Sequence, residues 1–250
     1  MIYGLYQSAA GMMTNEYRHG VLANNLANAD TVGFKRDVAV FAERLRADQA
    51  GVRRGPSDPR LGPMTGGVWL GQAHTDFSEG ALVRTENSLD VALAGPGFLV
   101  VEASGQTLLT RDGRMVRTFD GRLVSAADGA SILGVGGQPL RVNPRGGEVT
   151  VDELGRVEQD GLTVGQLGVT DVADYDALRK VGGGRFAFDP QQVTAAPARV
   201  MSGFVENSAV EPVTELVSML EASRAYQLNA QMVTLQDQTV GRLINAVATS

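Results

Sequence analysis

The sequence contains no cysteine, which excludes a disulfide framework and every metal site built on thiolates. Its only histidines are His19 and His74, so nitrogen ligands for a metal are scarce as well. It has no run of about 18 apolar residues, and a transmembrane helix is therefore not expected. Residues 1–11 lack a basic start followed by an uninterrupted apolar stretch, so no standard secretory signal peptide is predicted.

The sequence also has no large excess or dense cluster of positive charge. The formal net charge is -6, and the 22 Lys and Arg residues do not form a dense patch. Nucleic-acid binding requires clustered positive charge, and the pair Arg53 and Arg54 is too small to supply it, so we expect no nucleic-acid partner. The 250 residues are 43% hydrophobic, which is enough for one substantial core or two modest ones.

Several polar residues could be taken for metal-binding or catalytic groups, but a structural role fits each of them better. Asp171, Asp174 and Asp176 are not spaced as in an EF-hand loop, and we expect them to begin a solvated helix instead of binding a metal. We expect His74 to lie in a surface turn and His19 to lie at an interface or in a core.

Two glycine clusters, at residues 134–137 and 182–184, match no phosphate-binding loop and are expected in hairpins or bulges. The sequence thus predicts no enzyme, no cofactor, no metal site and no small-molecule substrate. An enzyme would need a pocket that joins His74 or the aspartates to a nucleophile.

The N-terminal residues predict a helix over 1–27. A heptad seam runs along it, and a second stripe of small or short polar residues lies on a neighbouring face. The seam consists of Leu5, Ala9, Met12, Glu16, His19, Ala23 and Leu26, and the stripe of Gly4, Ser8, Gly11 and Asn15. Glycine within a helix costs about 1 kcal/mol, so Gly4 and Gly11 indicate close approach of another backbone.

A short second helix is expected after a break near Gly33, because Val38, Phe41, Ala42 and Leu45 follow helical spacing. Residues 48–67 are rich in proline and glycine and predict an extended connector.

From about residue 68 to 201, short apolar runs alternate with turn residues, which predicts an antiparallel β domain. Asp-Gly pairs begin at Asp112, Asp120, Asp128 and Asp160 and favour type I′ hairpin turns. Trp69 is expected to pack against this domain.

A long helix is predicted over 211–247, with Glu211 as its cap and Pro212 as its first residue. The fold class is therefore α+β, with terminal helices in a coiled-coil domain and a central β domain. The expected divisions are a helical assembly segment at 1–47, the connector at 48–67, the β domain at 68–205 and a C-terminal assembly helix at 206–250. Each terminal helix carries more apolar surface than one partner can bury, which indicates self-assembly.

Three blocks of residues, in order along the chain, resemble the flagellar basal-body rod and hook protein family. The first is NNLANADTVGFK at residues 24–35, and the last includes Arg224, Ala225, Tyr226, Asn229 and Asp237. Between them lie LDVAL at 89–93, GPGF at 95–98 and TRDG at 110–113. Residues 199–208 and 210–213 are similar to the proximal-rod branch of this family, more than to the distal-rod branch. Glu16 and His19 depart from the family, which favours apolar or uncharged groups there.

The resemblance implies a structural subunit that polymerises helically with copies of itself and with other rod proteins and transmits torque. It also implies export through the flagellar type III apparatus and a place in the basal body within the periplasm. The assembly interface is expected to include Gly4, Leu5, Ala9, Gly11, Met12, Asn24, Asn25, Leu26, Ala27, Asn28, Thr31, Gly33, Phe34, Leu220, Arg224, Ala225, Tyr226, Leu228, Asn229 and Met232. The residues alone leave one other class open, a secreted adhesin-like β module on a trimeric coiled-coil stalk.

Overall fold

The computed structural model describes residues 2–43 and 67–248, and it divides into two compact units. The helical unit comprises Met1–Ala27, Asp37–His74 and Glu211–Ser250. The β unit comprises Asn28–Arg36 and Thr75–Val210. Helices at both ends of the chain enclose a long run of strands in the sequence, which confirms the predicted α+β class.

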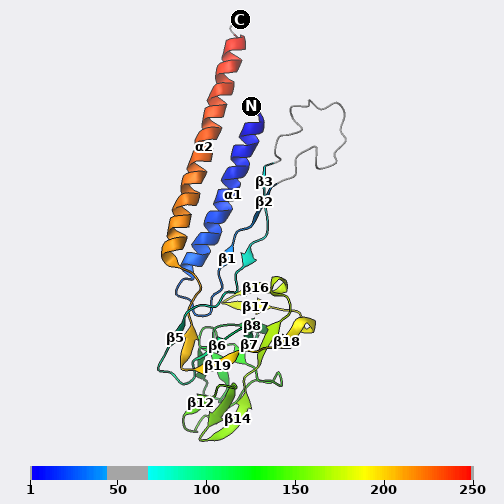
Figure 1. Ribbon diagram of the computed structural model, residues 1–250, viewed down its shortest axis with the longest axis vertical. Coiled ribbons are helices and arrows are strands. Elements are labelled where there is room, and N and C mark those ends of the chain that lie inside the picture. Colours follow the sequence, from blue (N-terminus) through cyan, green and yellow to red (C-terminus); the bar gives the residue numbers. More distant parts are fainter. Residues whose placement is uncertain (1, 44–66, 249–250) are drawn as a thin grey trace. The chain divides into compact units, whose positions relative to one another are not determined.

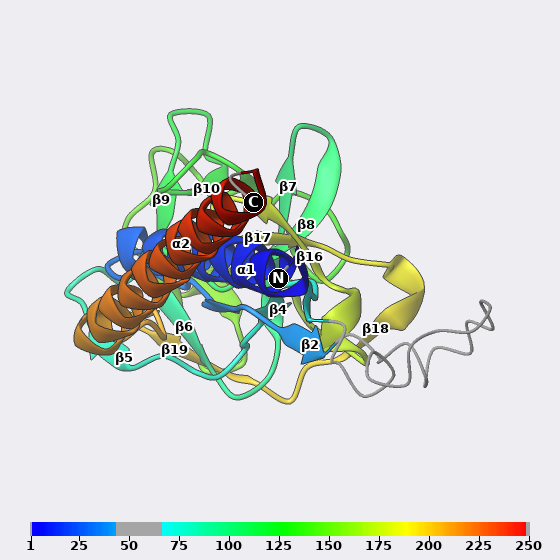
Figure 2. The same ribbon diagram turned by 90° about the horizontal axis from the view of Figure 1, so that it is seen from above.

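Two long helices dominate the helical unit, α1 (Ile2–Ala27) and α2 (Pro212–Ala248). They lie side by side in both views (Figures 1 and 2). Pro212 occupies the first position of α2, as predicted, and the Glu215 amide closes the first turn on the Glu211 carbonyl oxygen at 3.0 Å. No helix in the described part of the chain is long and apolar enough to cross a bilayer.

The residues that follow the first break form strands, so the predicted short helix at 38–45 is wrong over its described residues. The strands here are β1 (Asp37–Val38), β2 (Phe41–Glu43), β3 (Val68–Leu70) and β4 (His74–Thr75). β2 pairs antiparallel with β3, and Gly71 donates its amide hydrogen to the Val40 carbonyl oxygen at 3.0 Å. Val38, Val40 and Phe41 favour extended backbone, and this local preference outweighs the helical spacing of the apolar residues.

The prediction for Trp69 is also wrong. Trp69 lies on β3 in the helical unit, where 60% of it is exposed. The predicted connector at 48–67 falls, apart from Gly67, outside the described residues.

The β unit is antiparallel throughout the strand pairs that the structure describes, as predicted. Its main sheet has nine strands in the order β16-β17-β8-β7-β11-β10-β9, with β15 also on β7 and β18 on β15. The remaining strands form the three-stranded sheet β12-β13-β14 and the pairs β19-β6 and β20-β5. Their bounds are β5 (Leu82–Arg84), β6 (Val91–Ala94), β7 (Phe98–Ala103), β8 (Gln106–Thr110), β9 (Met115–Arg117), β10 (Leu123–Ser125), β11 (Ser131–Ile132), β12 (Val149–Val151), β13 (Arg156–Gln159), β14 (Leu162–Gln166), β15 (Val169–Val172), β16 (Arg179–Gly182), β17 (Arg185–Ala187), β18 (Val193–Ala195), β19 (Arg199–Ser202) and β20 (Phe204–Glu206).

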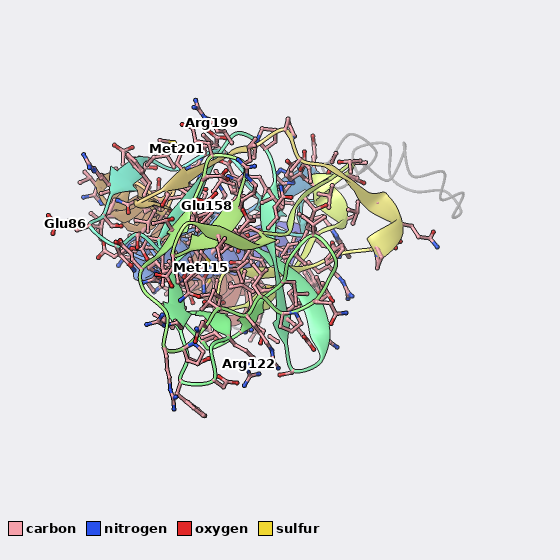
Figure 3. The ribbon with its side chains drawn as sticks, turned by 90° about the horizontal axis from the view of Figure 1, so that it is seen from below. Glu86, Met115, Arg122, Glu158, Arg199 and Met201 are labelled. Atoms are coloured by element: carbon pink, nitrogen blue, oxygen red, sulfur yellow. The ribbon has the colours of Figure 1, made fainter. Side chains whose placement is uncertain are left out.

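Two apolar clusters hold this unit together. The larger one includes Leu99, Met115 and Leu123, each at most 1% exposed. Figure 3 shows Met115 near the middle of the unit, whereas Arg199 lies at its margin. The smaller cluster is aromatic and joins Phe98 to Phe186 with ring centroids 5.7 Å apart. Full burial of one such side chain contributes about 1.5–3 kcal/mol, so each cluster of several buried side chains stabilises the unit.

The prediction of type I′ turns at Asp-Gly pairs is confirmed at one pair and wrong at another. Asp160 and Gly161 have φ angles of 54° and 77° and turn between paired strands β13 and β14, which confirms a type I′ turn there. At Asp112 the prediction is wrong, because strands β8 and β9 on either side do not pair with each other. The pair of residues Ser104 and Gly105, also with positive φ, makes an unpredicted hairpin between β7 and β8.

Candidate assembly site

The stripe of small residues on α1 faces α2 of the same chain. A Cβ atom added at Gly4 would lie 2.7 Å from the Gln236 Nε2 atom, and one at Gly11 would lie 3.0 Å from the Asn229 amide group. The Asn229 Nδ2 atom meanwhile donates to the Ala225 carbonyl oxygen at 2.9 Å. The close approach expected at Gly4 and Gly11 is therefore found within the chain, against polar side chains of α2.

These contacts set an antiparallel register between the two helices. Gly4 and Gly11 are seven residues apart, and so are their partners Gln236 and Asn229. One further step of seven along α2 reaches Ala222, which is 0% exposed. The α1–α2 contact thus repeats every seven residues on α2, a period typical of coiled coils.

The predicted seam on α1 lies on a neighbouring face and is only partly covered by this chain. Leu5 is 39% exposed, Ala9 is exposed, and Met12 and Leu26 are half-buried. Apolar side chains that stay this exposed on one face of a helix indicate that a further partner packs against that face.

A small cavity lies where this face meets α2. Its volume is about 240 Å³, and Asn15, Glu16, His19, Ala222, Ser223 and Tyr226 line it. The two residues that interrupt the seam, Glu16 and His19, are both in this lining, so they give the groove between the helices a polar rim.

The far side of α2 carries a row of exposed apolar residues, which we call the outer face and define as Val213, Val217, Leu220, Leu228 and Leu235. Their exposed fractions are 70%, 51%, 58%, 61% and 56%. An α-helix turns by about 100° per residue, so these positions lie on the opposite side from buried Ala222. Of the other predicted residues on α2, Met232 is 49% and Tyr226 37% exposed, Arg224 is exposed, and Ala225 and Asn229 are half-buried.

The end of α1 is fixed by an asparagine. Asn25 is 1% exposed, and its Nδ2 atom donates to the Asp37 carbonyl oxygen at 2.8 Å while its Oδ1 atom accepts from the Asp37 amide at 2.9 Å. The side chain thereby satisfies both backbone groups of Asp37, as a paired strand would. Its neighbours Asn24 and Ala27 are exposed.

The leading segment of the β unit, residues 28–36, contains the rest of the N-terminal signature. Asn28 and Thr31 form a turn in which the Thr31 amide donates to the Asn28 carbonyl oxygen at 3.1 Å. Gly33 has φ +69° and is so closely packed that an added Cβ would lie 2.5 Å from the Arg111 carbonyl carbon. Phe34 is 8% exposed, and the Lys180 ammonium lies 4.6 Å from the centroid of its ring. Gly33 and Phe34 are therefore buried by contacts within the chain.

Three charged residues that sequence reasoning did not assign to a site meet where Lys35, which belongs to this segment, packs into the β unit. Lys35 is 1% exposed, and its Nζ atom lies 2.5 Å from Oε1 of Glu206, which is also 1% exposed. The other carboxylate oxygen of Glu206 accepts from Nη1 of Arg111 at 3.1 Å. Each of the three belongs to, or directly adjoins, a different block that carried the resemblance. Their presence in blocks that all resemble the same family is the sequence signal that could have linked them.

Ionisation in the β unit follows these contacts. Burial lowers the pKa of Lys35, although attraction to Glu206 opposes that shift. Burial also raises the pKa of Tyr175 to about 12, helped by the hydrogen bond that its hydroxyl donates to Asp171 at 2.6 Å. The backbone amide of Ser78 lowers the pKa of Asp76 by donating to its carboxylate.

The candidate metal and phosphate motifs take structural roles. Asp174 caps a short 3-10 helix, Tyr175–Ala177, so the prediction of a helix start is confirmed. Gly182 ends β16, where it pairs with Arg185 of β17, and Gly183 and Gly184 form the turn between these strands. Among the described residues, no three His, Asp or Glu side chains are grouped so that they could hold a metal ion.

Comparisons with known proteins match both ends of the chain to family models. Residues 5–35 match the family model described as "Flagella basal body rod protein", and residues 201–246 match "Flagellar basal body rod FlgEFG protein C-terminal". Flagellar basal-body rod protein FlgF of Caulobacter vibrioides is 35% identical, over 92% of this chain and 91% of that protein.

Two further relatives cover almost the full length. FlgG of Buchnera aphidicola subsp. Schizaphis graminum is 30% identical over 97% of this chain and 99% of its own. FlgF of Rhizobium meliloti is 30% identical over 98% and 97%, respectively. Similarity of this extent covers both units and the segments that join them.

Proposed function

Because the chain belongs to the family of flagellar basal-body rod proteins, we propose that it polymerises through the exposed faces of α1 and α2 as a subunit of the proximal rod. The family is a structural one, and the chain is a structural subunit of the basal body. Its partners in the proposal are further copies of itself and other rod proteins, and its place is the periplasmic part of the basal body, reached through the type III export apparatus.

The observation that carries the assembly proposal is the outer face of α2. The inner side of this helix packs on α1, but Leu220, Leu228 and Leu235 on the opposite side are more than half exposed. Large assembly interfaces have apolar centres, and this face offers one along much of the helix. The seam on α1, with Leu5 and Met12, adds a second partly exposed apolar surface.

The seven-residue register between α1 and α2 supports a coiled-coil arrangement of these helices. In this proposal the internal α1–α2 contact forms one seam, and the outer face of α2 forms another with a neighbouring subunit. Segments 1–47 and 206–250 supply the assembly contacts, 48–67 serves as the connector, and 68–205 is the β domain that the assembly carries. Many such contacts in parallel would transmit torque along the rod.

Two observations support the proximal rod over the distal rod. The sequence at residues 199–208 and 210–213 resembles the proximal type. The FlgF protein of Caulobacter vibrioides, which is of the proximal-rod type, is also more similar to this chain than the FlgG protein of Buchnera aphidicola, of the distal-rod type, at 35% against 30% identity. Deleting the gene and complementing the strain with this chain tests the assignment. If the chain is a proximal-rod subunit, rods of the deletion strain are expected to stop within the proximal segment, and complementation is expected to restore the full rod. Deletion-strain rods with a complete proximal segment that lack only the distal segment would contradict the assignment.

Charge substitutions on the outer face test the assembly role. Leu228→Glu is expected to leave the monomer folded, because Leu228 is 61% exposed, and to abolish incorporation into basal bodies. Leu162→Glu is the matched control, since Leu162 is 73% exposed but lies on β14 of the β unit. Equal incorporation of both variants would refute an assembly role for the outer face.

A further inference from the structure

Lys35, Arg111 and Glu206 form a buried trio with an unequal charge count. Lys35 and Glu206 are each 1% exposed and Arg111 is 4% exposed. Two cations share one carboxylate, so the trio carries one net positive charge in a place that water does not reach. Charges in such surroundings interact far more strongly than they do at a surface.

Glu206 is the centre of the trio. Its Oε1 atom accepts from the Lys35 ammonium at 2.5 Å and from the Gly80 amide at 3.0 Å. Its Oε2 atom accepts from Arg111, which also donates to the Leu93 and Gly95 carbonyl oxygens at 3.2 and 2.9 Å. The Glu206 backbone carbonyl accepts from the Gly33 amide at 2.7 Å, so this one residue holds the leading segment through its backbone and its side chain.

The trio joins parts of the chain that are far apart in sequence. Lys35 and Glu206 are separated by 171 positions, and Glu206 lies on β20, where it pairs with Leu82 of β5. Burial of Lys35 beside Arg111 is therefore favourable only after β20 has brought its carboxylate into place.

We propose that Glu206 acts as an electrostatic latch, which lets residues 28–36 dock on the β unit only when its carboxylate lies between Lys35 and Arg111. Without that carboxylate, the two cations repel each other in a buried site. Residues 28–36 therefore detach from the β unit, while the core of the β unit stays folded. The latch is a property of the single chain and goes beyond the assembly role proposed above.

Amide hydrogen exchange on the purified full-length monomer tests the latch. The reporters are Gly33, whose amide donates to Glu206, and Asp76, whose amide donates to the Arg36 carbonyl oxygen. The internal references are Val100 and Leu133, whose amides are bonded within the main sheet. Glu206→Gln raises the net charge of the trio to two, and it is expected to lower protection at both reporters at least tenfold with the references unchanged.

The decisive comparison uses Lys35→Met, which removes one cation and leaves Arg111 paired with Glu206. It is expected to lower protection at the reporters less than Glu206→Gln does. Added to Glu206→Gln, it is expected to recover part of the lost protection, because it removes the repulsion. Arg122→Met is the matched control, since it removes an exposed ion pair of the same unit, between Arg122 and Asp120, whose side chains are 44% and 32% exposed.

If the double variant Lys35→Met with Glu206→Gln is less protected at Gly33 than Glu206→Gln alone, the trio holds the segment by hydrogen bonds and packing, and the latch is refuted. A second set of results would also refute the latch. In that set, Glu206→Gln loses protection at the references Val100 and Leu133, Lys35→Met keeps protection at both references and reporters, and the double variant recovers none of the loss.

Discussion

Gly33 and Glu206 are joined by a hydrogen bond of 2.7 Å from the Gly33 amide to the Glu206 carbonyl oxygen, although they belong to opposite ends of the family signature. Two positions after Gly33, the Lys35 ammonium lies 2.5 Å from the carboxylate of the same glutamate. A segment that sequence reasoning assigned to contacts between subunits is thus anchored inside its own chain, and the exposed faces of the helices remain for assembly.

Gly33→Ala is expected to destabilise the β unit by about 2–5 kcal/mol. Its φ of +69° strains any residue with a Cβ, and the new atom would lie 2.5 Å from the Arg111 backbone, which cannot swing aside. Chemical denaturation of the monomer measures the loss. Gly129→Ala is the control, because Gly129 has φ +73° with no atom within 4 Å, and it is expected to lose only about 1–2 kcal/mol. Equal losses would show that the close packing at Gly33 contributes nothing.

Gly11→Leu is expected to weaken the pairing of α1 with α2. Its Cβ would meet the Asn229 amide at 3.0 Å and force that side chain to move, at a cost of about 1–3 kcal/mol. Gly20→Leu is the control on the same helix, where no atom lies within 4 Å, and replacing glycine there should gain roughly 1 kcal/mol of helix propensity. Exchange rates of the α1 amides in the monomer measure both effects. Slower exchange in Gly11→Leu than in Gly20→Leu would contradict the register described here.

Tyr175 predicts a loss of stability in strong alkali. Its folded pKa of about 12 lies above the ordinary value of 10.0, so the folded state holds its proton more tightly than the unfolded state. The contribution of Tyr175 is fully present below pH 10 and is lost as pH rises through 12. Tyrosine absorbance titrated against pH should show one late-ionising group that is missing in Tyr175→Phe. If the titration curves of the wild type and of Tyr175→Phe differ by one tyrosine that ionises near the ordinary pKa of 10.0, the raised pKa of Tyr175 is contradicted.

Patterns that depend on local spacing predicted the fold well. The two terminal helices and the hairpin at Asp160 follow from short-range periodicity and turn chemistry, and the structure has them where expected. The predicted helix at 38–45 failed because helical spacing of four apolar residues competes with the strand preference of Val38, Val40 and Phe41.

Long-range contacts were beyond the reach of these patterns. Nothing local to Lys35 reveals that its partner lies 171 positions away, and a lone lysine in a turn is normally solvated. The stripe with Gly4 and Gly11 correctly indicated close helix packing, but a sequence cannot say whether the partner helix belongs to the same chain or to another. The structure answers that for Gln236 and Asn229.

The outer face of α2 is the contact between subunits on which the proposed assembly depends most. A photo-crosslinking amino acid placed at Leu228 in otherwise native chains, illuminated in intact basal bodies, measures this contact directly. The same probe at Leu162 on β14 gives the matched comparison. We predict that position 228 crosslinks to another rod subunit in good yield and that mass spectrometry locates the adduct on a terminal helix of that subunit. Incorporation of both probes with adducts from 162 and none from 228 would contradict the account.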